Sequence, residues 1–374
     1  MNQRLFFKYQ QTKLLWFISD CIKPRKILVI HGKKSYEATG ARLFVESSFS
    51  KHELEFFSDF ETNPKWEDFQ SGMQKIKAYR PDMIIAVGGG SVIDMAKLLC
   101  LLDEWVSFTD VFSQTNSFDL KRKIPVLAIP TTAGSGAETT QFAVIYHKQQ
   151  KHSIDHPKLL PDIVYLNHDF LKSQSKYNIA VSGTDALCQA LESLWSVNSN
   201  IISEKYAFEA FKLSYQALSN TLKNQTLDFE KMQWAAHLAG KSINITRTTA
   251  PHALSYAFTT FYGIPHGHAV ALTFPFFFKY NYFVTDEDCN NPKGSKYVKM
   301  QIEKVLSFLN CSIDDSETLL QSFFKSIGLE MDIQKLIPNF DSSLIIQNIN
   351  FQRLNNNPRK LNKDEVLNYL TKPH

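Results

Sequence analysis

Short apolar runs alternate with longer helical patterns in the first part of the chain, and this alternation predicts a parallel α/β sheet. The runs are Lys26–Ile30, Met83–Val87 and Ile124–Ile129. Each has the length of a buried strand, and a polar, helix-like stretch follows the first of them from Lys34. Strands and helices in alternation form parallel sheets, in which ligands bind beyond the carboxyl ends of the strands. Small or hydroxyl-bearing residues follow all three runs, as expected for such a site.

The strand pattern fades after about Asp162, and long helical stretches follow. They cover roughly residues 183–196, 203–220, 228–243 and 252–262, with a last helix near 363–370. We therefore expect two domains. The first is a Rossmann-like α/β nucleotide-binding domain with a parallel sheet over residues 1–162. The second is an all-α metal- and substrate-binding domain over residues 163–374.

The composition is that of an ordinary globular protein and excludes some partners. The 374 residues include 41 basic and 37 acidic side chains, a balance that does not indicate nucleic-acid binding. The chain lacks a run of about 18 apolar residues, so no membrane span is expected. Five scattered cysteines without a CxxC pair predict reduced thiols in the cytoplasm. The segment Met1–Lys13 lacks the apolar core of a signal peptide.

A glycine-rich segment joins the second apolar run to a helical stretch. Gly88, Gly89, Gly90 and Ser91 follow the strand and open the predicted helix Val92–Leu102. Glycine lets the backbone approach a phosphate closely, and the free N–H groups at a helix N-terminus favour the anion. Taken alone, the segment is also compatible with a turn that binds nothing.

Two segments of the chain resemble the cofactor signatures of the iron-containing alcohol dehydrogenases. The first is Gly88–Lys97 and the second is Ile129–Glu138. The resemblance extends over nearly the whole chain and implies an oxidoreductase that uses NADPH or NADH. Small residues would let the backbone approach this cofactor, and hydroxyls would bind its phosphate or ribose. The residues expected to contact the cofactor are Gly32, Gly88, Gly89, Gly90, Ser91, Asp94, Thr131, Thr132, Ser135 and Lys151.

The residues after the first apolar run bear on the choice between NADPH and NADH. Many NAD-preferring members of that family carry an acidic residue here, which binds the ribose hydroxyls. This chain instead has His31 and Gly32, followed by Lys33 and Lys34. Because no carboxylate repels a 2′-phosphate, we predict that NADPH is used at least as well as NADH. Ordinary solvated lysines are the alternative interpretation.

Four side chains in the helical part form a candidate metal site. Asp185 and Gln189 are four residues apart and share a helix face, while His252 and His266 lie fourteen residues apart. One carboxylate and two imidazoles suit a divalent cation and leave positions open for substrate. The resemblance implies Asp185, His252 and His266 as ligands of Fe(II), with Zn(II) as an alternative. That family usually has a histidine at the position of Gln189. Here the glutamine offers a carbonyl oxygen to the metal or to a water.

Further positions complete the predicted catalytic site. Tyr256 stands where that family commonly has a histidine near the nicotinamide. The predicted catalytic residues are therefore Tyr256, His252 and His266, with Tyr256 able to donate a proton or close the pocket. A buried aromatic side chain is the alternative for Tyr256. Gly263 and Pro265 mark the end of a helix, so we expect His266 to lie on a turn.

Within that family, Asp185–Val197 and Ala250–Tyr256 most resemble the phosphonoacetaldehyde reductases, which make 2-hydroxyethylphosphonate in phosphonate biosynthesis. A phosphonate needs a cation near its oxygen atoms, for which Arg247 and His152 are candidates. Two alternatives stay open: a general alcohol dehydrogenase acting on a small neutral alcohol or aldehyde, and a non-catalytic nucleotide-binding relative. We expect a homodimer or larger homo-oligomer.

Overall fold

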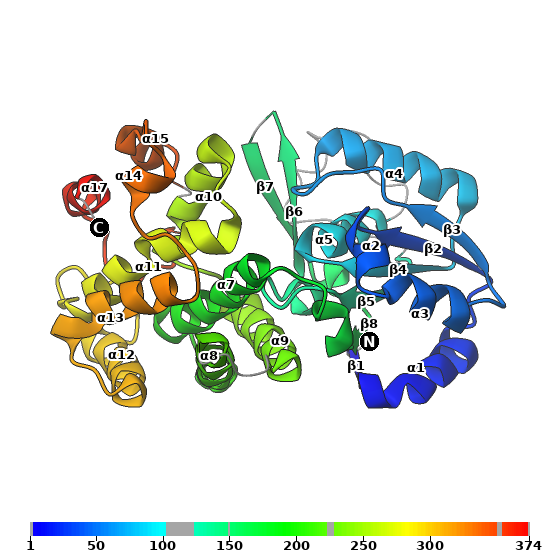
Figure 1. Cartoon of the computed structure of the whole chain (residues 1–374), viewed down its shortest axis with the longest axis horizontal. Helices are drawn as coiled ribbons and strands as arrows, with labels where there is room; N and C mark the ends of the chain where they lie inside the picture. Colours follow the sequence, from blue (N-terminus) through cyan, green and yellow to red (C-terminus); the bar gives the residue numbers. More distant parts are fainter. Residues whose placement is uncertain (1–2, 102–122, 149, 223–227, 350–353, 373–374) are drawn as a thin grey trace. The chain divides into compact units, whose positions relative to one another are not determined.

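The computed structural model describes residues 3–101, 123–148, 150–222, 228–349 and 354–372. The chain forms two compact units, Met1–Gln174 and Ser175–His374 (Figure 1). The first unit extends beyond the expected boundary at Asp162, because Ile163–Leu166 forms a strand of its sheet. The last residue of the predicted helix Val92–Leu102 lies outside the described residues.

The N-terminal unit contains a six-stranded parallel sheet with the order β1-β8-β5-β4-β2-β3. Its strands are β1 (Arg4–Phe7), β2 (Lys26–His31), β3 (Glu53–Phe57), β4 (Met83–Gly88), β5 (Val126–Pro130) and β8 (Ile163–Leu166). The three apolar runs form β2, β4 and β5, so the predicted α/β fold is confirmed. Two further strands, β6 (Phe142–His147) and β7 (Gln150–Asp155), pair as an antiparallel hairpin.

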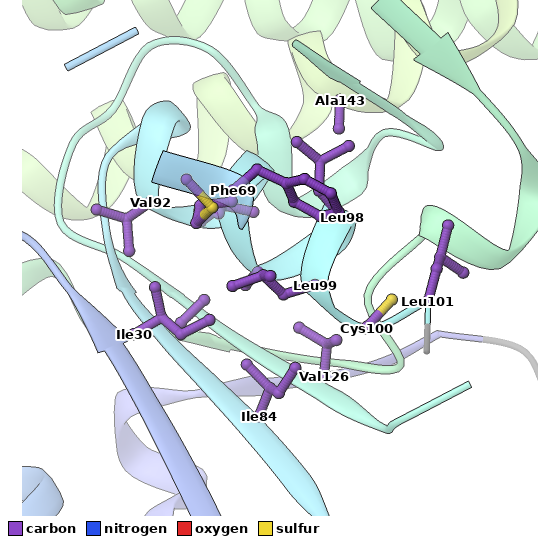
Figure 2. Close-up of a cluster of buried hydrophobic side chains, with 14 of the residues drawn as sticks. Ile30, Phe69, Ile84, Val92, Leu98, Leu99, Cys100, Leu101, Val126 and Ala143 are labelled. Carbon is purple, nitrogen blue, oxygen red and sulfur yellow. The ribbon is translucent and has the colours of Figure 1, made fainter. Parts of the chain in front are cut away.

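Helices cover both faces of this sheet. They are α1 (Gln11–Phe17), α2 (Ser35–Ala38), α3 (Ala41–Ser48), α4 (Trp66–Tyr79) and α5 (Gly90–Leu99). Alternate residues of each strand point to opposite faces. Figure 2 shows Ile30, Ile84 and Val126 in one core with residues of α4 and α5. Val29 and Ile85 belong to the other core, with residues of α1 and α3. Burial on both faces explains why the central strands are continuously apolar.

The C-terminal unit is helical, as predicted. Its helices are α7 (Lys176–Trp195), α8 (Ile201–Leu222), α9 (Phe229–Thr246), α10 (Ala250–Tyr262), α11 (His266–Tyr282), α12 (Ser295–Leu309), α13 (Ile313–Ser326), α14 (Ile333–Leu336), α15 (Ser342–Gln347) and α17 (Lys363–Thr371). None of the helices in the described part of the chain is long and apolar enough to span a bilayer.

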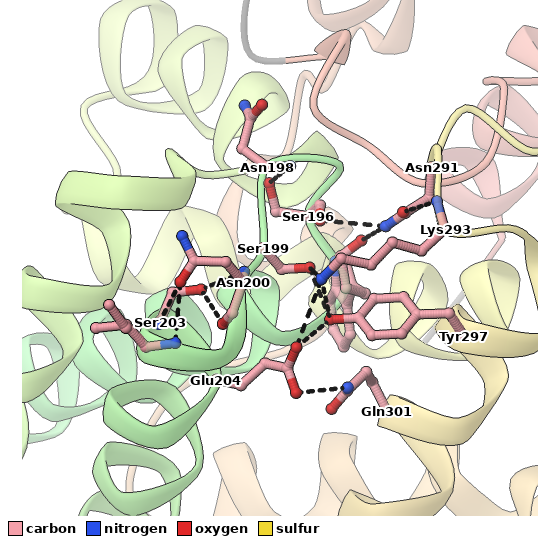
Figure 3. A network of polar contacts seen from close by, with 12 residues as sticks. Ser196, Asn198, Ser199, Asn200, Ser203, Glu204, Asn291, Lys293, Tyr297 and Gln301 are labelled. Atoms are coloured by element: carbon pink, nitrogen blue, oxygen red, sulfur yellow. Dashed lines mark hydrogen bonds and ion pairs between the residues drawn. The ribbon is translucent and has the colours of Figure 1, made fainter.

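Polar contacts fix the C-terminal end of α7. Asn291 Nδ2 donates hydrogen bonds to the carbonyl oxygens of Trp195 and Ser196, both at 3.2 Å. These carbonyls belong to the last turn, where intrahelical donors are missing. Beside them, the Tyr297 hydroxyl donates to Glu204 Oε1 at 2.6 Å (Figure 3). The helix that carries Asp185 and Gln189 is thereby anchored at its end.

Candidate metal and cofactor sites

Three of the predicted metal ligands come together in the C-terminal unit. Asp185 lies on α7, His252 lies in the first turn of α10, and His266 is the first residue of α11. One ligand atom from each side chain lies within 4.8 Å of the other two. His252 Nε2 is 3.2 Å and His266 Nε2 is 4.0 Å from Asp185 Oδ1. Asp185 and His252 are buried, whereas the His266 side chain is partly exposed.

The expectation that His266 lies on a turn is wrong, because this residue begins a helix. Gly263 ends α10 in the left-handed conformation, with φ of 68°, and Pro265 is the N-cap of α11. At Gly267, an added Cβ would lie only 2.0 Å from the carbonyl oxygen of Val181 on α7. This close approach of α11 to α7 places His266 beside Asp185.

Gln189, one helical turn after Asp185, has an unsatisfied side-chain oxygen. Its side chain is buried, and its Oε1 has no hydrogen-bond partner among the residues that the structure describes. Leaving a buried acceptor unsatisfied costs about 1–3 kcal/mol, which a bound cation would offset. One carboxylate, two imidazoles and an amide oxygen are types of ligand that fit a divalent cation such as Fe(II) or Zn(II).

The charges of the buried groups stabilise one another. Burial lowers the pKa of His252, but the carboxylates of Glu192 and Asp185 outweigh burial and raise this pKa to about 10. Burial likewise raises the pKa of Asp185, while the hydrogen bond from His252 and the charges of both imidazoles bring it below its ordinary value. Asp185 is therefore ionised at neutral pH and can serve as an anionic ligand.

The glycine segment lies at the C-terminal end of β4, as the sequence predicts. Gly89 is the N-cap of α5 and Gly90 is its first residue. A Cβ at Gly90 would lie 2.7 Å from Ser135 Oγ, and one at Gly89 would lie 3.2 Å from Thr132 Oγ1. The two segments predicted to bind the cofactor are thus adjacent in space, in a region too crowded for larger residues.

Thr131 offers a further polar group in the second segment. Its hydroxyl is buried and, among the described residues, has no hydrogen-bond partner. Its backbone N–H donates to Gly88 O at 3.0 Å, which joins the two segments. An unpartnered donor beside a glycine-rich helix start suits an anionic ligand such as the phosphate of a dinucleotide.

Two predicted cofactor residues make contacts within the protein. The Asp94 carboxylate accepts a hydrogen bond from the backbone N–H of Val144 at 3.0 Å. The Ser91 hydroxyl accepts one from the backbone N–H of Asn63 at 3.1 Å. Asp94 therefore ties α5 to β6, assisted by the fully buried Lys97, whose ammonium lies 3.5 Å from the carboxylate.

Both halves of the chain match family models. The model "Iron-containing alcohol dehydrogenase" matches residues 3–168, and "Fe-containing alcohol dehydrogenase family, C-terminal" matches residues 179–373. The chain belongs to the iron-containing alcohol dehydrogenase family. It is accordingly an NAD(P)-dependent oxidoreductase of that family.

Relatives within this family differ in the substrates for which they are named. The chain is 29% identical over 307 residues to phosphonoacetaldehyde reductase of Streptomyces viridochromogenes, covering 78% of this chain and 76% of that protein. It is 26% identical to NADPH-dependent butanol dehydrogenase of Clostridium saccharobutylicum, covering 92% and 90%. The fold is shared with sulfoacetaldehyde reductase from Bifidobacterium kashiwanohense, with TM-score 0.83, 22% identity and coverage of 98% and 96%.

In this family member, Tyr256 lies against one of the predicted ligands. Its ring stacks on the ring of His266, with centroids 5.7 Å apart and an angle of 6° between the planes.

His268, two residues after His266, has a contact at each of its ring nitrogens. Its Nδ1 is 2.9 Å from the Tyr177 hydroxyl, and its Nε2 is 2.7 Å from Glu330 O. These contacts make His268 a link between α7 and α11.

Glu192 is a site residue to which the sequence analysis assigned no role. It lies two helical turns after Asp185 on α7 and is fully buried. Its Oε1 accepts a hydrogen bond from His252 Nδ1. Its Oε2 accepts hydrogen bonds from the backbone N–H and the hydroxyl of Thr249. The available signal was its helical spacing, which places it on the face that carries Asp185 and Gln189.

The two residues predicted to bind the phosphonate of the substrate, Arg247 and His152, lie in settings that do not favour this role. Arg247 follows α9, with φ of 61°, and its Nη1 donates to the carbonyl oxygens of Asn244 at 2.9 Å and Ile243 at 3.5 Å. These contacts cap the C-terminus of α9, a common arginine role. His152 lies on β7 in the N-terminal unit, beside Lys151. Burial and the charge of His147 lower the pKa of His152, so its ring is a poor cation at neutral pH.

Proposed function

We propose that the protein is a metal-dependent NAD(P)H oxidoreductase that reduces an aldehyde to an alcohol. The observation that carries the proposal is the convergence of Asp185, His252 and His266, with Gln189 one helical turn after Asp185 and its Oε1 unpartnered among the described residues. These four side chains would hold the metal. When bound, the metal supplies Lewis acidity toward a carbonyl oxygen, and the reduced nicotinamide supplies a hydride.

The surrounding residues would orient the substrate and supply the proton. His266 is partly exposed and stacks on Tyr256, so the Tyr256 ring covers one side of the ligand group. A tyrosine hydroxyl is both donor and acceptor and can pass a proton to the oxygen of the product. Asp185 and His252, both buried, hold their positions without access for bulk water.

For the substrate, we propose phosphonoacetaldehyde, with 2-hydroxyethylphosphonate as the product. The support is the relative in Streptomyces viridochromogenes, which matches across most of both chains. Phosphonate recognition requires a cation or several donors away from the reacting carbon. The Arg247 guanidinium is our proposed phosphonate-binding group, because its positive charge and its fork of N–H donors suit phosphonate oxygens.

A small neutral aldehyde is the second candidate substrate. Two observations favour it: Arg247 caps its own helix, and the pKa of His152 is lowered. The similarity to NADPH-dependent butanol dehydrogenase agrees with this alternative. A non-catalytic relative gains no support, because the ligand group is retained.

A substrate panel tests both candidates. The purified protein is loaded with Fe(II) or Zn(II) without oxygen, its metal content is measured, and NADPH oxidation is followed with phosphonoacetaldehyde, sulfoacetaldehyde and propanal. A lost charge-assisted contact is worth roughly 1.5–3 kcal/mol, so we expect kcat/KM about 10- to 100-fold higher for phosphonoacetaldehyde than for propanal. Equal values refute the phosphonate proposal. Absence of turnover in metal-loaded protein with every aldehyde refutes the proposed function itself.

The matched variant is Arg247→Ala. If Arg247 binds phosphonate, the variant loses activity with phosphonoacetaldehyde and keeps its activity with propanal. An equal effect on both substrates assigns Arg247 to helix capping alone, and the phosphonate-binding role is then refuted.

A further inference from the structure

We infer that Glu192 is a positioning residue, which holds the Nδ1 proton of His252 and thereby leaves Nε2 as the nitrogen that gives up its proton to bind a metal. The inference rests on the proposed function, because it concerns the same group of ligands. It assigns a task to a fully buried carboxylate outside the proposed set of metal ligands.

The hydrogen bonds around Glu192 fix the position of the proton. An ionised carboxylate only accepts hydrogen bonds, so His252 Nδ1 must donate to Glu192 Oε1. On the other oxygen, Thr249 donates from its backbone N–H at 2.5 Å and from its hydroxyl at 2.8 Å. The indole N–H of Trp195 donates to the same hydroxyl oxygen at 3.2 Å, which leaves the hydroxyl proton for Glu192. Both carboxylate oxygens are therefore satisfied in one orientation.

The position of this proton decides whether His252 can bind a metal. A neutral imidazole binds through the nitrogen that carries no proton, and the partner of the other nitrogen selects the tautomer. With Nδ1–H held by Glu192, the nitrogen that can exchange its proton for a metal is Nε2, the atom 3.2 Å from Asp185 Oδ1. The opposite tautomer would direct an N–H group at the metal position.

Glu192 also fixes the orientation of the ring relative to Asp185. Both acidic residues belong to α7, whereas Thr249 is the N-cap of α10, the helix that carries His252. One carboxylate thus binds the start of α10 and its first-turn imidazole together. This arrangement holds the ring with respect to the helix that supplies the anionic ligand.

His266 has a weaker partner of the same kind. Ser255 donates its hydroxyl proton to His252 O at 2.8 Å, so its oxygen is available to accept a hydrogen bond from His266 Nδ1 at 3.3 Å. A neutral hydroxyl binds an N–H less strongly than a carboxylate does. We therefore expect a larger effect on metal binding from a change at Glu192 than from Ser255→Ala.

Glu192→Gln separates positioning from packing. The amide keeps nearly the same shape but replaces one acceptor by an NH₂ donor, while His252 and Thr249 present donors on both sides. If the NH₂ faces His252, Nδ1 must become the acceptor and the tautomer reverses. If it faces Thr249, the amide oxygen still accepts from Nδ1, but the NH₂ opposes the backbone N–H of Thr249 and displaces the first turn of α10, which carries the ring.

Thr249→Val is the matched control. It retains the branched shape and the backbone N–H but removes the hydroxyl bond to Glu192, without changing the contact to His252. A structural role of Glu192 alone predicts that both variants lower the melting temperature and leave zinc affinity unchanged. Positioning predicts that zinc affinity falls in Glu192→Gln and stays close to wild type in Thr249→Val.

The test combines zinc affinity with a direct view of the tautomer. Zinc dissociation constants are measured by chelator competition, melting temperatures are measured on metal-free protein, and ¹⁵N shifts of labelled histidine are recorded on zinc-loaded protein. We expect His252 of the wild type to carry its proton on Nδ1, and Glu192→Gln to bind zinc about 10- to 100-fold more weakly.

Two results would overturn the inference. One is a folded Glu192→Gln protein with wild-type zinc affinity. The other needs no variant: a zinc-loaded wild type in which the His252 proton lies on Nε2. A wild type that binds zinc with the expected tautomer but reduces no aldehyde refutes the proposed function and leaves the role of Glu192 standing.

Discussion

Gly267→Ala tests whether the close approach of α11 to α7 positions His266. The added methyl group would lie 2.0 Å from the carbonyl oxygen of Val181 and 3.0 Å from the Cβ of Asp185. The carbonyl belongs to the backbone of α7, so no side-chain rotation relieves the contact. The distance from the added Cβ to this oxygen must grow from 2.0 Å to at least 3.0 Å, so the two helices must separate by about 1 Å.

This displacement is large compared with the tolerance of a metal site. Ligand distances hold to within about 0.2 Å, and His266 directly precedes Gly267. We expect metal affinity to fall by about 10- to 100-fold, the usual effect of losing the support of a ligand. Overpacking costs about 1–3 kcal/mol, which lowers the melting temperature by roughly 2–4 °C for each kcal/mol.

The assay compares Gly267→Ala with Gly183→Ala in metal affinity and in melting temperature. Gly183 lies on α7. An added Cβ there would lie 2.7 Å from Leu218 Cδ2, a side-chain atom that can move. We expect Gly183→Ala to keep wild-type metal affinity. If Gly267→Ala binds metal as tightly as the wild type, the close helix contact does not position His266 and the reasoning is refuted.

Three further changes test individual roles. Asp185→Asn should abolish metal binding and turnover, because it removes the only anionic side chain proposed as a ligand; an unchanged metal content contradicts that assignment. Gln189→His should tighten metal binding, since imidazole is a stronger ligand than an amide oxygen; unchanged affinity in chelator competition would place Gln189 outside the ligand set. Gly32→Asp should shift the ratio of kcat/KM values toward NADH by roughly 1–2 kcal/mol through repulsion of the 2′-phosphate. A Cβ at Gly32 would lie 2.4 Å from Ser35 Oγ, so the protein with Gly32 and the protein with Asp at this position are compared in a Ser35→Ala background. Strong selectivity of the wild type for NADH contradicts the cofactor prediction.

The central strands could be predicted because burial on both faces leaves a continuous apolar signal. The strand β3 gives no such signal, since Glu53 and Glu55 occupy part of its length at the edge of the sheet. The strand β8 is short and follows Asp162, where the helical patterns begin, so the boundary between units was placed too early. The edge strand β3 depends on its neighbour β2 for stability, and the sequence of β3 alone does not specify that neighbour.

The candidate site was predictable to the extent that it depends on local spacing and on family resemblance. Helical spacing placed Asp185 and Gln189 on one face, and the resemblance supplied the two histidines. The role of Glu192 depends on the start of α10 facing α7, a tertiary contact that spacing does not encode. Arg247 was expected near a substrate, but its backbone turn directs Nη1 to the end of α9. The cytoplasmic location and the homo-oligomer stay predictions.

The most direct test of the central claim is a metal titration of activity. Protein freed of metal by a chelator is assayed for NADPH-dependent reduction of phosphonoacetaldehyde while Fe(II) or Zn(II) is added back. We predict no activity without metal, an increase until the site formed by Asp185, His252 and His266 is filled, and no recovery in Asp185→Asn. Reduction at the same rate by metal-free and metal-loaded protein would contradict the account.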